Sequence, residues 1–109
     1  LAQTGSSIDA VGQRCYRYLL TQPARARGVL QMMAAWDLQT FARTLPRLAV
    51  PVQMQIGLND GTIPPGQADQ AAQLLPHVQR IDWPGLGHLA HEEAPEGCAG
   101  GIEGFGDSN

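Results

Sequence analysis

The sequence predicts an α/β fold, and two observations carry that prediction. Apolar side chains recur at helical spacing through residues 8–45, with breaks at Pro23 and Asp37. Residues 50–83 then show the patterns of a strand, a helix and a second strand. Two strands joined by a helix at this spacing form a right-handed βαβ unit with parallel strands. We therefore expect a group of helices followed by a small parallel sheet.

Three helices are expected before the sheet. Ser7 or Asp9 could cap the first helix, whose apolar residues follow a period of about 3.6 residues. Pro23 suits the first turn of the second helix, because its fixed φ is already helical. Asp37 is the expected cap of a short third helix, which Pro46 ends.

The sheet is expected to consist of strands at residues 52–56 and 78–83, with a helix at residues 67–75 between them. The first strand alternates apolar and polar side chains. Its polar positions, Gln53 and Gln55, are unusual for an inner strand of a parallel sheet, which is normally apolar on both faces.

Composition divides the chain into three parts. Residues 1–46 form a helical segment, and residues 47–96 hold the βαβ unit. Residues 97–109 are rich in glycine and lack apolar periodicity, so we expect a flexible tail there. Pro95, just before this tail, is expected to prevent a regular helix from continuing.

The composition also excludes several kinds of partner. The formal net charge is −3, with 7 Lys and Arg residues, so we expect no nucleic-acid partner. No apolar run is long enough to span a membrane. Two distant cysteines without C-x-x-C spacing predict free thiols, no metal site and a reducing compartment. A cytoplasmic location is expected because no secretory signal is visible. These cysteines are Cys15 and Cys98, and the four arginines nearest to forming a basic patch, expected to be a solvated face, are Arg14, Arg17, Arg25 and Arg27.

An acid and a histidine follow the two predicted strands. In parallel α/β sheets, catalytic groups lie at the carboxyl ends of the strands, and adjacent strands bring their loops together. Asp60 follows the first strand and His88 follows the second. A carboxylate beside an imidazole is the orienting and proton-accepting half of a nucleophilic triad. We therefore predict Asp60 as the catalytic acid and His88 as the base.

Plainer interpretations of these residues stay open. Asp60 lies in an Asn-Asp-Gly sequence, where an Asx turn is common. His88 could cap a loop, and His88-x-x-His91-Glu92 could suggest a metal site. This spacing differs from H-E-x-x-H, so no metal or other cofactor is expected. Glu92 and Glu93 are instead expected to favour a helix N-terminus.

Apolar residues of the second predicted helix could contact a ligand. Met33 and Trp36 are candidates for lining an apolar pocket. The alternative is the buried face of a helix, which we expect for at least two of Met32, Met33 and Trp36.

Two motifs resemble those of the α/β-hydrolase-fold family. The first, G-x-x-D-x-x-x-P-P, is at residues 57–65, and the second, P-G-x-G-H, is at residues 84–88. The order acid then histidine is the end of that family's order Ser…Asp…His. The resemblance implies a helical cap segment followed by the last βαβ unit of an incomplete sheet, with Asp60 as acid and His88 as base.

Further parts of the chain resemble one subgroup of the same family. Residues 32–38 and 88–93 are similar to the magnesium-chelatase accessory proteins of bacteriochlorophyll biosynthesis. That resemblance implies a role in magnesium insertion into protoporphyrin and a small apolar or tetrapyrrole-like ligand. Two alternatives remain, a serine-type hydrolase of small esters and a binding protein without turnover.

The chain departs from the family pattern in two respects. It has no G-x-S-x-G elbow, and Ser6, Ser7 and Ser108 do not lie between a strand and a helix. We therefore expect that the nucleophile either lies upstream of residue 1, in a longer protein of which this chain is an inactive fragment, or does not exist. The family's final helix should follow Pro95, where the flexible tail is expected instead. Whether the complete protein is an enzyme stays open, as does its oligomeric state.

Overall fold

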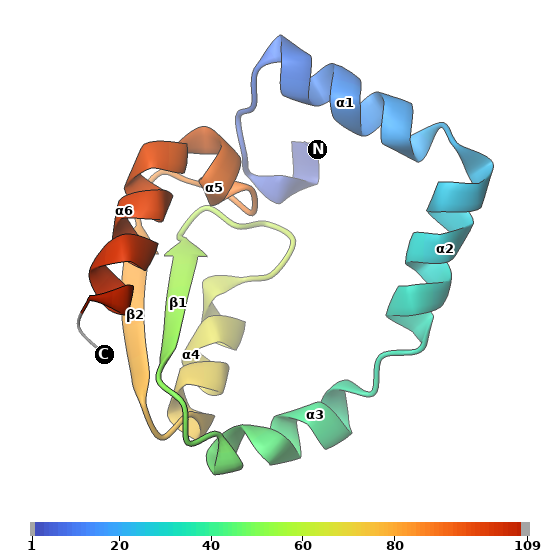
Figure 1. Ribbon diagram of the computed structural model, residues 1–109. Coiled ribbons are helices and arrows are strands. Elements are labelled where there is room, and N and C mark those ends of the chain that lie inside the picture. The colour runs from blue at the N-terminus through green and yellow to red at the C-terminus, as the bar shows by residue number, and fades with distance from the viewer. Residues whose placement is uncertain (1, 108–109) are drawn as a thin grey trace.

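The computed structural model describes residues 2–107 and has the predicted α/β architecture. Three helices come first, and they form a helical arm at residues 10–44 (Figure 1). The helices of the arm are α1 (Ala10–Leu20), α2 (Pro23–Ala34) and α3 (Leu38–Thr44). The remaining elements are β1 (Val52–Gly57), α4 (Pro65–Leu74), β2 (Val78–Trp83), α5 (Ala90–Glu93) and α6 (Pro95–Gly106). Short 3-10 turns lie at Ala2–Thr4 and Leu45–Arg47.

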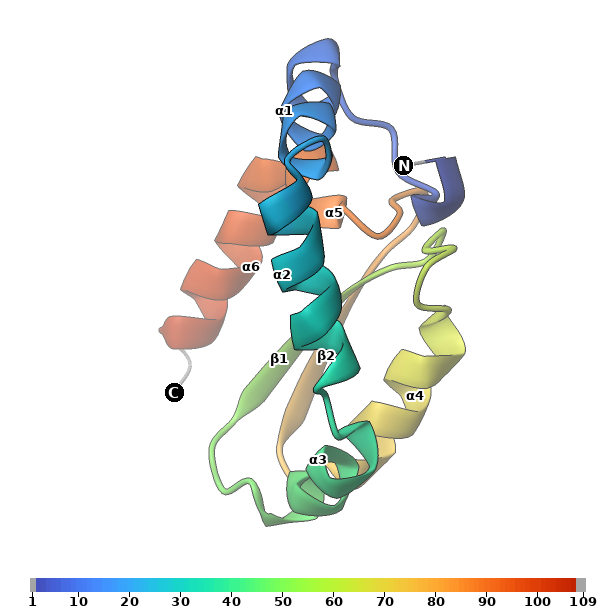
Figure 2. The same cartoon turned by 90° about the vertical axis from the view of Figure 1, so that its right-hand side faces the viewer.

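The two strands pair in parallel, as the βαβ pattern predicted. Their register runs from Val52 opposite Val78 to Gly57 opposite Trp83. Figure 2 shows the strands between α4 and α6, so one helix covers each face of the sheet. Within residues 2–107, no further strand pairs with either strand, and the sheet is therefore the incomplete one that was expected.

The predicted caps of the arm are present, and one alternative is resolved. Asp9 caps α1 by accepting the Gly12 N–H at 2.7 Å, and Asp37 caps α3 by accepting the Thr40 N–H at 2.9 Å. Ser7, the other candidate cap, instead donates its N–H to a carboxylate from α5.

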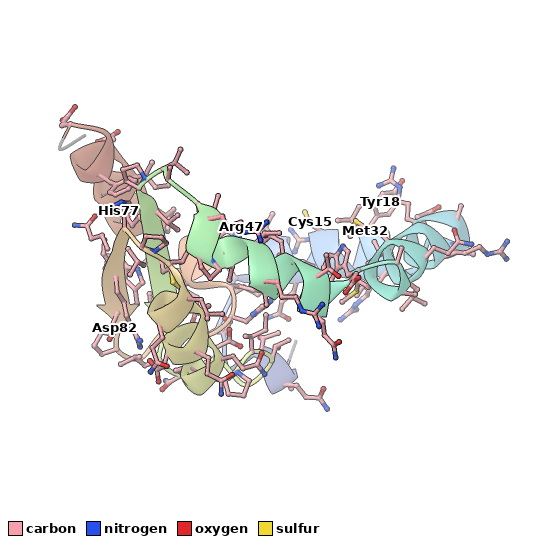
Figure 3. The ribbon with its side chains drawn as sticks, turned by 90° about the horizontal axis from the view of Figure 1, so that it is seen from below. Cys15, Tyr18, Met32, Arg47, His77 and Asp82 are labelled. Carbon is pink, nitrogen blue, oxygen red and sulfur yellow. The ribbon has the colours of Figure 1, made fainter. Side chains whose placement is uncertain are left out.

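The predicted buried face of the second helix is wrong, because its apolar residues are exposed and Trp36 lies beyond the end of α2 at Ala34. Met32, Met33 and Trp36 are each at least 50% exposed. The main packing neighbour of α2 is α1, and both belong to the arm that arches away from the sheet (Figure 1). Figure 3 shows Tyr18 and Met32 on the side of the molecule away from His77 and Asp82.

The prediction of a flexible tail at residues 97–109 is also wrong for the part that the structure describes. Pro95 ends α5 but starts α6, because proline is accommodated in the first turn of a helix. Residues up to Gly106 are helical, whereas residues 108 and 109 lie outside the described range. A helix therefore does follow Pro95, as the resemblance implied.

Tertiary contacts explain why a glycine-rich segment is helical. A Cβ atom at Gly97 would lie 3.1 Å from the Trp83 ring, and one at Gly101 would lie 2.9 Å from Gln55 Nε2. Glycines therefore let α6 lie close against the sheet. The Gln55 side chain donates to the Cys98 carbonyl at 3.0 Å, and Gln53 donates to the Gly101 carbonyl at 2.9 Å. The two polar positions of β1 thus bind the helix backbone.

Candidate active site

Asp60 lies in the turn that follows β1, and its two carboxylate oxygens have different partners. Oδ1 accepts the backbone N–H groups of Thr62 at 2.8 Å and Ile63 at 2.9 Å. This is the Asx-type turn that Asn-Asp-Gly suggested. Oδ2 lies 2.8 Å from Nδ1 of His88. The turn therefore directs Oδ2 toward the histidine. The Asx turn and the contact with His88 are both present, and each uses a different oxygen of the same carboxylate.

Glycines let the loops that carry these residues approach each other. A Cβ atom at Gly57 would lie 2.1 Å from the Gly87 carbonyl oxygen, so only glycine fits there. The Asn59 N–H donates to the Leu86 carbonyl at 2.8 Å and holds the loops together. Gly85 has φ +83°, a left-handed conformation that the turn after β2 needs.

Electrostatics keep Asp60 ionised beside the imidazole. Partial burial raises the pKa of Asp60, but hydrogen bonds from Ile63 N–H, from His88 and from Thr62 N–H together outweigh it. The pKa consequently lies below its ordinary value of 3.8. A carboxylate acceptor at Nδ1 fixes the tautomer of a neutral histidine with the proton on Nδ1. Nε2 is then an acceptor, and it has no hydrogen-bond partner among residues 2–107.

A cavity of about 1170 Å³ adjoins the pair. His88 and Asp60 both line it, and their side chains are 34% and 13% exposed. Most of the remaining lining is apolar and includes Trp36, Phe41, Met54, Ile56 and Ile102. Trp36 therefore lies where a ligand contact was predicted, whereas Met33 is not among the lining residues.

Metal-binding and membrane-spanning features are both absent from the described part of the chain. No three His, Cys, Asp or Glu side chains of residues 2–107 are grouped to hold a metal ion. His91 Nε2 lies 3.7 Å from Glu92 Oε1, on the surface. Both cysteines are free thiols, Cys15 exposed and Cys98 buried. In the same range, no helix has the length and apolar character that crossing a membrane requires.

The serines near the histidine have structural partners. The Ser6 hydroxyl oxygen accepts the Leu89 N–H at 2.8 Å, and the Ser6 side chain also hydrogen-bonds Glu93. Ser7 uses its backbone N–H in the same cluster. Neither side chain is bonded to His88. Ser108 lies outside the described residues.

Sequence reasoning missed the part played by Glu93 and the segment 4–7. Glu93 lies in the single turn of α5, in agreement with the expected position near the start of a helix. Its carboxylate, however, binds the backbone of the segment 4–7 and of the histidine loop, which is residues 84–89 between β2 and α5. The signal in the sequence was weak, because the Glu93 and Ser7 partners are 86 positions apart.

Comparisons with known proteins agree with this architecture. A family model for the alpha/beta hydrolase fold matches residues 7–95. The "Magnesium-chelatase 30 kDa subunit" of Rhodobacter capsulatus is 41% identical to the chain over 104 residues. That alignment covers 94% of this chain and 36% of the relative, so the chain spans about a third of the relative's length.

Proposed function

Because the chain belongs to the α/β-hydrolase-fold family, we propose that Asp60 and His88 are the acid and base of its catalytic relay. The observation that carries this proposal is the 2.8 Å contact between Asp60 Oδ2 and His88 Nδ1. It has the geometry in which an acid orients a base toward a nucleophile.

In this proposal, each residue has one chemical task. Asp60 stays ionised, orients the imidazole and stabilises the imidazolium that forms when His88 takes a proton. Nε2 of His88 accepts that proton from a nucleophile that residues 2–107 do not supply. The acidic partner keeps its charge throughout, because backbone N–H groups of Thr62 and Ile63 also stabilise it.

The biological setting that we propose is magnesium insertion into protoporphyrin during bacteriochlorophyll synthesis, with the complete protein as an accessory to magnesium chelatase. Support comes from the 41% identity to a magnesium-chelatase subunit. The apolar cavity next to His88 is large enough for a small apolar or tetrapyrrole-like ligand. Its lining contains no Lys or Arg, so such a ligand would be held mainly by apolar contact.

A chimaera tests the proposal in a pigment-forming cell. This chain replaces the matching segment of the Rhodobacter capsulatus relative in a strain that lacks that relative. His88→Ala and Asp60→Ala should each lower the bacteriochlorophyll yield about tenfold or more relative to the unsubstituted chimaera, because general-base catalysis is lost. Absorbance of extracted pigment and the amount of chimaera protein are measured together.

His77→Ala is the matched control, since His77 is exposed and precedes β2, whereas Asp60 follows the opposite end of the parallel strand β1. It should leave the pigment yield unchanged. Purified chimaeras are also assayed for hydrolysis of a small chromogenic ester, which an active hydrolase would turn over. An unchanged pigment yield and unchanged ester turnover in both His88→Ala and Asp60→Ala would overturn the relay and favour a binding role on the same fold.

A further inference from the structure

The backbone of the histidine loop is held at three consecutive positions by groups from outside the loop. The Gly87 N–H donates to Glu93 Oε2 at 2.8 Å, and the His88 N–H donates to the Thr4 carbonyl at 2.9 Å. The Leu89 N–H donates to the Ser6 hydroxyl oxygen at 2.8 Å. None of these three N–H groups is therefore available to bind a ligand or an oxyanion.

Glu93 hydrogen-bonds both the histidine loop and the segment 4–7. Its Oε2 accepts from Gly87, and its Oε1 accepts the Ser7 N–H at 2.8 Å. The side chain of Ser6 hydrogen-bonds the same carboxylate. One acidic side chain thus ties the histidine loop to the segment 4–7.

The segment 4–7 also reaches the loop of the acid. The Thr4 carbonyl that accepts from His88 also accepts the Gly61 N–H at 3.4 Å. A Cβ atom at Gly5 would lie 1.8 Å from the Asn59 carbonyl oxygen, so the segment passes in contact with the Asp60 turn. The same short segment therefore contacts the loop on each side of the Asp60–His88 pair.

We propose that Glu93 is a positioning residue, which fixes the segment 4–7 against the histidine loop and thereby holds His88 Nδ1 on Asp60 Oδ2. This inference rests on the proposed relay and adds a residue that acts through the histidine. Glu92, the preceding acid, has a different task, because it accepts a hydrogen bond from the Tyr16 hydroxyl on α1. Only Glu93 of the two contacts the backbone beside His88.

The charge of Glu93 suits this task. Partial burial raises its pKa, but the hydrogen bonds from the Ser7 N–H, the Gly87 N–H and the Ser6 side chain together outweigh it and lower the pKa below its ordinary value of 4.5. An ionised carboxylate offers acceptors on both oxygens, whereas a glutamine amide offers one oxygen and two donors. Glu93→Gln consequently places an NH2 donor where one of the two oxygens accepted from Gly87 or Ser7, although it keeps the size of the side chain.

Nuclear magnetic resonance of the 109-residue chain provides the test. The proton on His88 Nδ1 is a direct signature of the bond to Asp60, and its exchange with water reports how firmly that bond is held. Glu93→Gln should speed this exchange about tenfold or more, since one charge-assisted hydrogen bond is lost. The amides of Gly87 and Ser7 should lose protection with it, while amides of β1 and β2 keep theirs.

Glu96→Gln is the matched control, because it removes the same charge from an exposed acid on α6. It should leave the Nδ1 exchange unchanged. Glu93→Ala should exceed the effect of Glu93→Gln, because it removes every acceptor.

Two results would overturn the inference. One is an unchanged Nδ1 exchange rate in Glu93→Gln, and the other is faster exchange throughout the sheet, which would assign Glu93 to general stability. Failure of the relay itself has a different signature, since His88→Ala would then keep full pigment yield while Glu93→Gln still loosened the histidine.

Discussion

At the scale of single residues, Asp60 combines a structural and a chemical contact in one carboxylate. Oδ1 forms the turn after β1 with Thr62 and Ile63, and Oδ2 accepts from His88. The hydrogen bonds of the turn restrict the rotamer of Asp60 independently of His88. A short side chain in an Asx turn is therefore a well-defined acceptor for a neighbouring loop.

Asp60→Asn should reveal the contribution of the ionised carboxylate to stability. Because the folded-state pKa is lowered, the carboxylate stabilises the fold above its ordinary pKa of 3.8, and this stabilisation is lost as the pH falls through the folded-state value. Asparagine keeps one oxygen for the turn but loses the charge that faces His88. We expect the free energy of unfolding at pH 7 to fall by about 1–2 kcal/mol.

Urea unfolding of both proteins at pH 7 and at pH 3 checks this prediction. The difference in the free energy of unfolding between the unsubstituted chain and Asp60→Asn should be smaller at the lower pH. Asp107→Asn, at an exposed acid beyond α6, should show little difference at either pH. A difference for Asp60→Asn that is equally large at both pH values would contradict the assigned role of the charge.

At the scale of elements, α6 shows how contacts with a sheet override helix propensity. Glycine costs about 1 kcal/mol relative to alanine inside a helix. Here the absence of side chains at Gly97 and Gly101 lets Gln53 and Gln55 reach backbone carbonyls. The Trp83 indole N–H also donates to Gln55, at 3.1 Å, so the polar strand positions form a network under the helix.

Two neighbouring glycines of α6 should respond in opposite directions to the same substitution. A Cβ atom at Gly100 meets nothing within 4 Å, so Gly100→Ala should raise the free energy of unfolding by about 0.5–1 kcal/mol through helix propensity. A Cβ atom at Gly101 would crowd Gln55 and Ile81 at 2.9 and 3.1 Å. Gly101→Ala should therefore lower it by about 1 kcal/mol, through strain in a packed contact.

Thermal and urea unfolding of the two variants measure these changes. Gly104→Ala, another position with open space, serves as a second reference for the propensity gain. A Gly101→Ala variant that is as stabilised as Gly100→Ala would contradict the close packing of α6 against the sheet at Gly101.

At the scale of the whole molecule, the helical arm is connected to the rest of the fold near both of its ends. The Tyr16 hydroxyl of α1 donates to Glu92 of α5, and α3 leads into the 3-10 turn that contacts α4. This bond raises the pKa of Tyr16, and burial and the charge of Glu92 raise it further. Between these connections the arm arches away from the sheet (Figure 1).

Tyr16→Phe should loosen the arm without disturbing the sheet. Loss of a hydrogen bond to a charged acceptor should increase transient opening of the arm about fivefold. Trypsin should then cut faster at Arg25 and Arg27 of α2, as measured by mass spectrometry over time. Tyr18→Phe is the control, because Tyr18 is 61% exposed on the same helix, and its cleavage rate should match that of the unsubstituted chain. Equal rates in the two variants would show that the Tyr16–Glu92 bond does not restrain the arm.

Local chemistry allowed much of the fold to be predicted from the sequence. Proline at position 23, acids at positions 9 and 37 and the alternation in β1 act through neighbouring residues, and the helices and strands began where these signals indicated. The positions of Asp60 and His88 followed from strand order, because parallel neighbours bring their carboxyl-end loops together. The resemblance to the α/β-hydrolase family was confirmed by the family match.

The sequence by itself therefore determined the order of the elements up to β2, the parallel pairing and the pair of loops that meet at the sheet edge. Each of these depends on contacts local in the chain or on general rules of sheet topology. Only the tertiary structure decided that glycine-rich residues form α6, that Trp36 rather than Met33 lines the cavity, and that Glu93 binds Ser7 and Gly87. These features depend on groups that are distant in the chain and meet only after folding. Neither helix propensity nor residue spacing carries that information, because both describe a segment without its partners.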